Sequence, residues 1–596
     1  MSTIIRCPIC GTPIHPDKME YDHVCIEYGN RRFCFCSESC RKSFLEGPRI
    51  AYFSMEIAVA NEIPTYSGGL GILAGDVVRS SADLRLRLIA LTLVSRKGYL
   101  KQRITSKGEQ LEYPDEWNPE KSLTLMPKNV KVRIEGRDVI IQAWLYEHQS
   151  FTGGLVPVLF LDTDVEGNVT EDRRITDYLY GGDDEYRLKQ EIILGIGGIR
   201  ILKELFFNVR KYHMNEGHSS LLTLQLLRDN DMDNERVRNL CVFTTHTPAE
   251  AAFDKFSYST FQRIYSEDFP LDILKKYASA DALDMTELGS NLSKYLNGVS
   301  EAHREYSMDH FPGHYIRAIT NGVHSYTWTS TPFRELFDRY IPGWANEPIM
   351  LGRASQIPNN EIWDAHNKAK MSLFEFVKNK TYFEMDMKAL TIGFARRSTA
   401  YKRGSLIFNS LERLRRIDSI GKLQLIFAGK AHTKDEDGKR IIKEIHQYMA
   451  ELGDDVKTVY LENYDMDTAA KLTSGVDIWL NTPLPPFEAS GTSGMKAAHN
   501  GVINFSVLDG WWVEGCIEGV TGWAIGAPSN MPITPAERRK RELEDIYNKL
   551  EYLIIPMFYY KRDDWINIMK NSIGKVAYYF QAQWMMRRYI TEAYLL

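Results

Sequence analysis

Short apolar segments alternate with amphipathic segments along the chain from about residue 49 onward. The apolar segments have the length of strands, and the segments between them carry apolar side chains at the three- and four-residue spacing of a helix. Strands that alternate with helices predict parallel sheets, and strands that are apolar throughout predict sheets covered on both faces. We expect strands at residues 88–94, 156–161, 240–244, 390–394, 423–427, 458–461 and 476–480, and helices at residues 185–205, 404–417, 439–452 and 465–474.

The same pattern divides the chain into parts of different character. The alternation is unbroken from residue 388 to residue 506, which predicts one doubly wound domain, and a second such domain precedes it. Near the end, Thr534-Pro535-Ala536-Glu537 matches a capping box with proline at the first helical position. We predict a Cys-rich N-terminal module (1–48), a first doubly wound domain (49–330), a helical connector (331–385), a second doubly wound domain (386–530) and C-terminal helices (531–596).

The composition fits a large folded protein that binds neither nucleic acid nor membrane. The 596 residues are 44% hydrophobic and 12% aromatic, which is enough to bury extensive apolar surface. With 73 basic and 78 acidic residues, the formal net charge of −5 argues against nucleic acid and anionic membranes as partners. No run approaches the ~18 uncharged apolar residues of a membrane span. The first residues lack an apolar leader, so we expect a cytoplasmic protein.

Six of the eight cysteines lie within the first forty residues. Cys7 and Cys10 have the C-x2-C spacing of a ligand pair, Cys36 and Cys40 have the C-x3-C spacing, and four thiolates suit a closed tetrahedral zinc site. A module of this size cannot build a sufficient core alone, so a metal staple is expected. Disulfides are the competing interpretation, which the missing secretory leader disfavours.

Residues 34–44 resemble the end of small YHS/TRASH-type metal-binding domains. We predict that a structural Zn2+ ion is held by Cys7, Cys10, Cys36 and Cys40. The surplus candidates are Cys25, Cys34, His15 and His23, and we expect the two surplus cysteines to be small buried apolar residues.

A glycine-rich turn, Tyr66-Ser67-Gly68-Gly69-Leu70-Gly71, precedes the helix-prone residues 73–84. Such a turn exposes backbone N–H groups at the positive end of a helix, where an anion can bind. Paired glycines are more often simple turns, so this segment alone is a weak signal.

Four cations follow the expected strand that ends near Ala395, namely Arg396, Arg397, Lys402 and Arg403. Ligands of doubly wound sheets bind beyond the carboxyl ends of the strands, so these cations predict a phosphate site. The alternative is a solvated basic surface. Cations at the start of the predicted helix would oppose its dipole, and a bound anion would remove that conflict.

A loop of small residues, 488–496, enters a further helix-prone segment. It begins with Glu488, ends with Lys496 and can surround a phosphate with backbone amides and hydroxyls. Lysines usually lie on a wet surface, but Lys496 has apolar neighbours in the sequence. It could therefore form an imine or act as a counterion.

Histidines and polar residues follow several apolar strands of the first domain. A lone histidine is more often a packed residue than a catalytic one, but several polar clusters at strand ends fit a cleft better than a core. These clusters are residues 213–218, 244–248, 297–298 with His303, and 320–324.

Together these segments resemble the α-glucan (glycogen, starch and maltodextrin) phosphorylase family, in its short prokaryotic form. The resemblance implies a GT-B fold, in which two Rossmann-like domains enclose the active site and a C-terminal helix crosses back to the first domain. The first domain would bind the glucan, and the second would bind the cofactor and phosphate. The matching segments are residues 51–56, 67–71, 215–218, 245–247, 396–403, 428–431, 461–464, 488–496 and 508–510.

The resemblance also implies the reaction. Inorganic phosphate would cleave the terminal α-1,4 glucosyl bond of glycogen or maltodextrin and give glucose 1-phosphate with retained configuration. Lys496 would carry pyridoxal 5′-phosphate as an imine, and the phosphate of this cofactor, rather than its ring, would act on the substrate phosphate. The partners are thus a glucan and phosphate, and a homodimer is compatible with this expectation.

The functional positions of the family carry over residue by residue. Those that match catalytic groups are Arg397, Lys402, the backbone carbonyl of His246 and the backbone amide of Gly69. Further positions that match the cofactor's surroundings are Tyr464, Arg396, Thr492, Ser493 and Gly68. Those that match sugar contacts are Glu488, Ser490, Gly491, Asn321, Glu216 and His218.

The chain departs from the long animal and plant members of that family. Its cofactor loop has Ser493-Gly494 where those members have Gly-Asn, and Asp465 stands where they carry arginine. Their N-terminal segments for phosphorylation and nucleotide activation have no visible counterpart, and the Cys-rich module is not part of the usual pattern.

Two other functions are open at this point. A nucleotide-sugar-dependent glycosyltransferase of the glycogen synthase type would share the fold and the basic pair, but it needs no imine-forming lysine such as Lys496. A non-enzymatic glucan-binding or metal-sensing protein would have no reason to keep the whole set of motifs.

Overall fold

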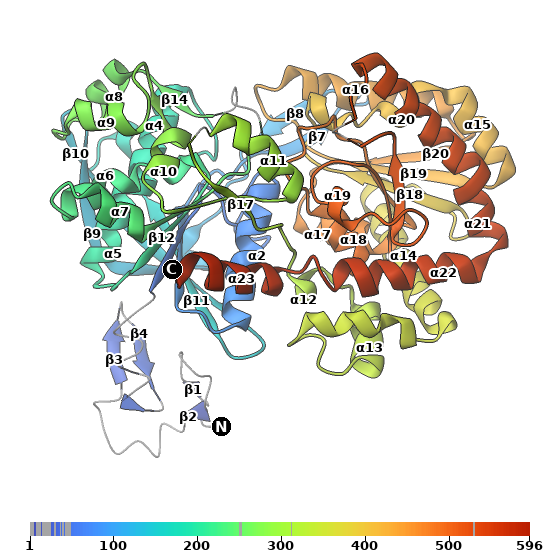
Figure 1. The fold of residues 1–596 in the computed structure, drawn as a ribbon, viewed down its shortest axis with the longest axis horizontal. Coiled ribbons are helices and arrows are strands. Elements are labelled where there is room, and N and C mark those ends of the chain that lie inside the picture. The colour runs from blue at the N-terminus through green and yellow to red at the C-terminus, as the bar shows by residue number, and fades with distance from the viewer. Residues whose placement is uncertain are drawn as a thin grey trace.

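The computed structural model describes residues 5–6, 13–14, 25–28, 31–35, 37–38, 41, 49–248, 253–311, 313–528 and 531–595. Two large sheets lie side by side, each flanked by helices (Figure 1). This is the mixed α/β, GT-B architecture that the alternation of strands and helices and the family resemblance led us to expect.

The first sheet has nine strands in the order β17-β16-β13-β12-β5-β6-β11-β10-β9. All neighbours from β17 to β11 are parallel, so the carboxyl ends of these strands meet at one edge of the sheet. The long strands β10 and β9 add an antiparallel extension that we did not predict. The strands are β5 (Ile50–Phe53), β6 (Leu88–Leu93), β9 (Thr124–Ile134), β10 (Arg137–Gln149), β11 (Leu155–Asp162), β12 (Lys211–Asn215), β13 (Cys241–Thr244), β16 (Tyr295–Gly298) and β17 (Ile316–Ala318).

The second sheet has six parallel strands in the order β20-β19-β18-β21-β22-β23. The strand order reverses between β18 and β21, and ligands of doubly wound sheets bind at this switch point. The Arg396 segment follows β18, and the Glu488 loop follows β21. The strands are β18 (Leu390–Ala395), β19 (Leu423–Ala428), β20 (Lys457–Leu461), β21 (Ile478–Asn481), β22 (Ile503–Val507) and β23 (Gly522–Ile525).

One predicted helix begins later than expected. Residues 404–417 were expected to be helical, but Leu406–Asn409 form a 3-10 turn and α15 (Leu411–Ile420) starts after Ser410. The Ser410 hydroxyl accepts the Arg413 amide at 3.3 Å, so it caps the helix at this later point. The cations that follow β18 therefore do not stand at the start of a long helix, and the dipole conflict that we inferred there does not arise.

The last helices connect the two sheets. α20 (Pro535–Lys549) starts where we predicted, because the Thr534 hydroxyl accepts the Glu537 amide at 3.2 Å. After α22 (Arg562–Asn571), α23 (Ala582–Tyr589) returns to the first domain and packs against α2 (Gly69–Asp83), as the red helices labelled α22 and α23 in Figure 1 show. The chain thus contains the crossing C-terminal helix that the family resemblance implies.

A short hairpin of the first domain reaches the second domain. β7 (Lys101–Ile104) pairs with β8 (Gln110–Tyr113), and the hairpin lies between the two large sheets (Figure 1). Gln110 Nε2 donates to Ala431 O, and the Ala431 amide donates to Gln110 Oε1, both at 3.0 Å. This hairpin therefore binds a carboxyl-end loop of the second sheet to the first domain.

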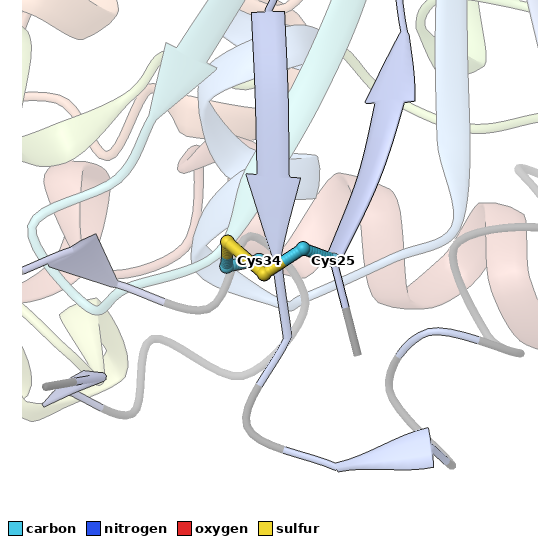
Figure 2. The surroundings of a disulfide bond; sticks show 2 residues. All are labelled: Cys25 and Cys34. Carbon is cyan, nitrogen blue, oxygen red and sulfur yellow. A yellow bond between two sulfur atoms is a disulfide. The ribbon is translucent and has the colours of Figure 1, made fainter. Parts of the chain in front are cut away.

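The described part of the N-terminal module contains a second hairpin. β3 (Cys25–Tyr28) pairs with β4 (Arg31–Cys34) in a register that sets Cys25 opposite Cys34, with Cα atoms 4.1 Å apart. A disulfide joins the two residues (Figure 2). Our preference for unpaired cysteines is wrong for this pair, because strand pairing brings the two thiols together.

The four predicted zinc ligands, Cys7, Cys10, Cys36 and Cys40, lie outside the described residues, as do His15 and His23. In the described part of the chain, no group of three or more His, Cys, Asp and Glu side chains is arranged to hold a metal ion. No helix in that same part is long and apolar enough to cross a membrane.

Candidate active site

The predicted site residues come from facing edges of the two sheets. Hydrogen bonds join these edges directly: Ser300 Oγ donates to Ala489 O at 2.6 Å, and the Met466 amide donates to the Tyr66 hydroxyl at 3.0 Å. The first domain contributes Gly68 and Gly69 at the start of α2, Glu216, His218 and His246 after β12 and β13, and Asn321 after β17. The second domain contributes residues 396–402 after β18, Tyr464 after β20, and residues 488–496 after β21.

Glu488 lies at the centre of the second-domain part of the site. Its carboxylate accepts Lys402 Nζ at 2.8 and 2.9 Å and Arg396 NH2 at 2.5 Å. Burial alone would raise the pKa of Glu488, but Arg396 and Lys402 lower it to about 2, so the carboxylate stays ionised. One carboxylate is thus shared by two cations.

Arg397 has a different environment. Its side chain is exposed, and in the described part of the chain it makes no ion pair. Partial loss of water around the guanidinium lowers the pKa of Arg397. Tyr401, Tyr99 and Glu56 raise that pKa by more, so the guanidinium stays charged. Tyr99 and Glu56 belong to the first domain, so this cation faces the interface between the domains.

A cavity of about 10 Å³, the space that one water molecule needs, lies beside these cations. Its polar lining comes from Arg396, Arg397, Thr399 and Lys402, and Phe394 and Phe427 are among its apolar lining. The Thr399 hydroxyl and Arg396 Nε are buried and have no hydrogen-bond partner among the described residues. Buried polar groups normally have partners, so these unmet donors fit an anionic ligand.

Glu56 holds the glycine-rich turn in place. Its carboxylate accepts the amides of Ser67 and of Gly68, the latter at 3.3 Å, and the Tyr180 hydroxyl donates to it at 3.0 Å. A Cβ atom built on Gly68 or Gly69 meets nothing within 4 Å, so open space lies beside both glycines. The first amides of α2 therefore border open space, where an anion can accept them.

Lys496 is buried in α18 (Ser493–Ala498) beside groups of the first domain. Its Nζ lies 3.7 Å from the centroid of the Trp328 ring, and Trp328 Nε1 donates to Asp76 at 2.8 Å. Burial lowers the pKa of Lys496 to about 8, although Asp76 raises it. The neutral form of this amine, which attack on an aldehyde requires, is therefore more populated than for an ordinary lysine.

Glu216 orients the predicted groups at the ends of β12 and β13. Its Oε2 accepts the His246 amide at 2.7 Å and the Thr247 hydroxyl at 2.9 Å. Burial lowers the pKa of His246 to about 3, so its ring is neutral. His218 Nε2 lies 3.4 Å from Asp254 Oδ2. Burial lowers the pKa of His218 to about 4.

The remaining predicted residues line the same interface. Gly491 has a left-handed φ of 80°, and a Cβ there would lie 3.2 Å from Glu488 Oε1, so glycine suits this position. Asn321 Oδ1 is buried without a hydrogen-bond partner in the described residues. Burial raises the pKa of Tyr464, and Asp465 raises it too, while the nearby charge of Arg396 lowers it. Ser490 precedes Gly491, and Thr492 and Ser493 lie at the start of α18.

Comparison with known proteins decides the family. A family model described as carbohydrate phosphorylase matches residues 270–520. The chain is 38% identical to a maltodextrin phosphorylase of Thermococcus litoralis, over 91% of this chain and 70% of the relative. It is 33% identical to glycogen phosphorylases of Aquifex aeolicus and Mycobacterium tuberculosis, over 91% of this chain and 86% and 70% of those relatives. The chain belongs to the carbohydrate phosphorylase family.

The structure explains two departures of this carbohydrate phosphorylase from the long members. A Cβ atom at Gly494 would lie 2.2 Å from Asn504 Oδ1, so an asparagine at 494 would collide with Asn504. Asp465 caps α17 (Met466–Gly475), since its carboxylate accepts the Thr468 amide at 2.8 Å. Gly494 thus serves local packing, and Asp465 serves helix capping.

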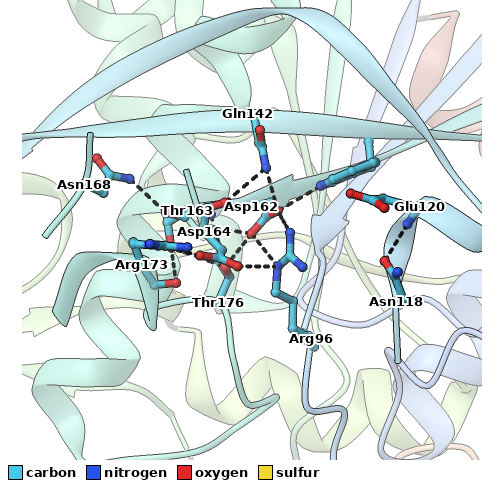
Figure 3. Close-up of polar contacts among 12 residues, drawn as sticks. Arg96, Asn118, Glu120, Gln142, Asp162, Thr163, Asp164, Asn168, Arg173 and Thr176 are labelled. Atoms are coloured by element: carbon cyan, nitrogen blue, oxygen red, sulfur yellow. Dashed lines mark hydrogen bonds and ion pairs between the residues drawn. The ribbon is translucent and has the colours of Figure 1, made fainter. Parts of the chain in front are cut away.

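The sequence did not reveal the groups that join the two first-domain loops from which Tyr99 and Tyr180 act on Arg397. Arg96 NH2 donates to Asp162 at 2.6 Å, and Trp144 Nε1 donates to the same carboxylate at 2.8 Å (Figure 3). The Arg96 amide also donates to Thr176 O at 3.1 Å, which joins the loops that carry Tyr99 and Tyr180. These residues are far apart in the sequence, so no local motif predicts that they lie together.

We predict that Glu56→Ala lowers the phosphorylase turnover by about tenfold to hundredfold, because it frees the glycine-rich turn and misplaces its amides. The measurement is steady-state turnover of the purified variant beside the wild type. Glu62→Ala is the matched control, since Glu62 is an exposed carboxylate on the same segment. Equal turnover of the two variants would contradict the role of Glu56.

Proposed function

We propose that this carbohydrate phosphorylase is an α-1,4-glucan phosphorylase. It transfers the terminal glucosyl unit of glycogen or maltodextrin to inorganic phosphate and releases glucose 1-phosphate with retained configuration. The observation that carries the proposal is Arg397, an exposed guanidinium at the switch point that makes no ion pair in the described part of the chain. The names of the relatives, maltodextrin phosphorylase and glycogen phosphorylase, support the same substrates.

The residues present fit pyridoxal 5′-phosphate as the cofactor. Lys496 offers a buried amine with a pKa of about 8, and the unmet donors of Arg396 and Thr399 suit a phosphate group. When bound, the cofactor supplies a phosphate group that acts as an acid–base or electrostatic partner of the substrate phosphate. The residues that would hold it are Lys496, Tyr464, Arg396, Thr492, Ser493 and Gly68.

The chain's own residues bind and orient the reacting groups. Arg397, Lys402 and the Gly69 amide bind the substrate phosphate and hold it toward the sugar. The backbone carbonyl of His246 faces the sugar as positive charge develops on it, and Glu216 fixes that residue through its amide. Glu488 and Lys402 are buried, so their ion pair is shielded from bulk water and is stronger than an exposed pair would be.

The sugar contacts follow from the same arrangement. Glu488 has oxygens that can accept sugar hydroxyls while it stays paired with Arg396. Charged acceptors of this kind make strong hydrogen bonds to hydroxyls. The further residues proposed to contact the glucan are Ser490, Gly491, Asn321, Glu216 and His218.

Three other expectations stay predictions. The spacing of Cys7, Cys10, Cys36 and Cys40 supports a structural zinc ion. The cytoplasmic location and the homodimer rest on the sequence and on the family.

We predict that the purified protein has the absorbance band of bound pyridoxal and that Lys496→Ala abolishes it. Lys430→Ala is the matched control, because burial also lowers the pKa of Lys430 to about 8 but its Nζ donates to Leu100 O at 3.0 Å. This control should keep the full band. A band that survives in Lys496→Ala would contradict the assignment of Lys496, and a wild type without the band would favour a sugar-nucleotide transferase.

Arg397→Ala should lower the turnover of maltodextrin phosphorolysis by about 10²–10³-fold, because it removes the cation that binds the reacting phosphate. The pyridoxal content should stay unchanged, since Lys496 is intact. Arg440→Ala, which removes an exposed cation of the same domain, should keep wild-type turnover. Unchanged phosphorolysis in Arg397→Ala would falsify the phosphate assignment.

A further inference from the structure

Gln102 is a fully buried amide of the hairpin β7–β8, and it contacts two loops of the other domain. Its backbone amide donates to Asn463 Oδ1 at 3.1 Å, and its Oε1 accepts the Asn463 amide at 2.8 Å. Its Nε2 donates to Gly429 O and to Gln110 Oε1, each at 2.8 Å. One side chain of the first domain therefore joins the loop after β19 to the loop after β20.

The loop after β19 is hydrogen-bonded to the phosphate-binding segment, residues 396–403. The Arg396 amide donates to Ala428 O at 3.2 Å, and the Ser398 amide donates to Lys430 O at 2.9 Å, so Arg397 lies between two backbone bonds to this loop. A Cβ atom on Gly429 would lie 2.2 Å from Arg396 O, so only glycine fits this contact. Any movement of Gly429 therefore moves the backbone that carries Arg397.

The loop after β20 leads to the residue predicted to contact the cofactor. Asn463 has a left-handed φ of 55° and directly precedes Tyr464. Gln102 holds both the amide and the side chain of Asn463, so it restrains this unusual conformation.

The hairpin also brings first-domain groups to Arg397. Tyr99 lies just before β7, and its ring centroid is 5.8 Å from that of His432. Arg397 acts on the pKa of Tyr99 and on that of His432, so the three groups are neighbours. The first domain thus approaches the phosphate-binding segment in two ways, through Tyr99 beside Arg397 and through Gln102 on the loop after β19.

We infer that Gln102 is a positioning residue for the phosphate subsite, which it holds in place from the opposite domain through the carbonyl of Gly429 and the backbone of Asn463. The inference rests on the proposed phosphate site. Gln102 touches no reacting group. It acts through the loop after β19, which is hydrogen-bonded on either side of Arg397, and through the loop that carries Tyr464. Because its bonds go to these loops, the binding of phosphate should depend on it more than the binding of glucan.

The neighbouring residue on the same strand provides a matched control. Arg103 pairs with Glu462 of the second domain, but its side chain is 64% exposed. Exposed ion pairs contribute little to stability. Arg103→Ala therefore removes an exposed contact with the loop after β20, while the Ile104 amide still donates to Glu462 at 2.9 Å and the contact with Gly429 is kept.

The test is the affinity of the holoenzyme for inorganic phosphate, measured by isothermal titration, together with the KM values for phosphate and maltodextrin. Gln102→Met keeps the volume of the side chain and loses its hydrogen bonds. We expect it to raise the phosphate Kd and KM about tenfold and to leave the maltodextrin KM within about twofold. Arg103→Ala should match the wild type in all three values.

Gln102→Asn is the second variant if Gln102→Met does not fold. It keeps an amide, but it is too short to reach Gly429 and Asn463 together, so it should weaken phosphate binding in the same way. A phosphate Kd within about twofold of the wild type, or equal losses for phosphate and maltodextrin, would overturn the inference. A wild type that binds phosphate but makes no glucose 1-phosphate would instead refute the proposed function, and the phosphate affinities of the variants would still decide the role of Gln102.

Discussion

The concentration of positive charge at the switch point of the second sheet is the constraint on which the site depends. Arg396 and Lys402 share the single carboxylate of Glu488, and Arg397 has no ion-pair partner in the described part of the chain. Arg396 and Lys402 are largely buried, and cations withdrawn from bulk water are costly unless anions compensate them. Glu488 compensates them only in part. In the proposed function, the phosphate of the substrate and that of the cofactor supply the negative charge that balances these cations.

This charge becomes useful because two sheets present complementary edges to one another. The second sheet supplies the cations and Lys496, and the first supplies backbone groups that Glu56 and Glu216 hold in place. Neither set would form the site alone. The groups that bind the domains together therefore belong to the functional apparatus, although they touch no reacting atom. The hairpin β7–β8 is the clearest example, since it contacts the loop after β19, whose backbone is hydrogen-bonded to the segment that carries the cations.

Much of this could be predicted from the sequence, and the reasons for the exceptions are physical. Apolar runs bounded by turns indicated the strands, and the capping box at Thr534 predicted the start of α20. The start of α15 was misjudged because the capping residue, Ser410, lies inside a segment with helical periodicity. Glu56 and Gln102 act across the fold, so their roles depend on which loops the topology brings together. The Cys25–Cys34 disulfide likewise depends on strand register, which cysteine spacing does not reveal.

The most direct measurement is the formation of glucose 1-phosphate from maltodextrin by the purified protein with inorganic phosphate, compared with the same mixture in which a nucleotide sugar replaces phosphate. The account predicts that α-glucose 1-phosphate accumulates only with phosphate and that maltodextrin is shortened as it forms. It also predicts no chain extension from the nucleotide sugar. Elongation of maltodextrin by the nucleotide sugar, with no glucose 1-phosphate formed from phosphate, would contradict it.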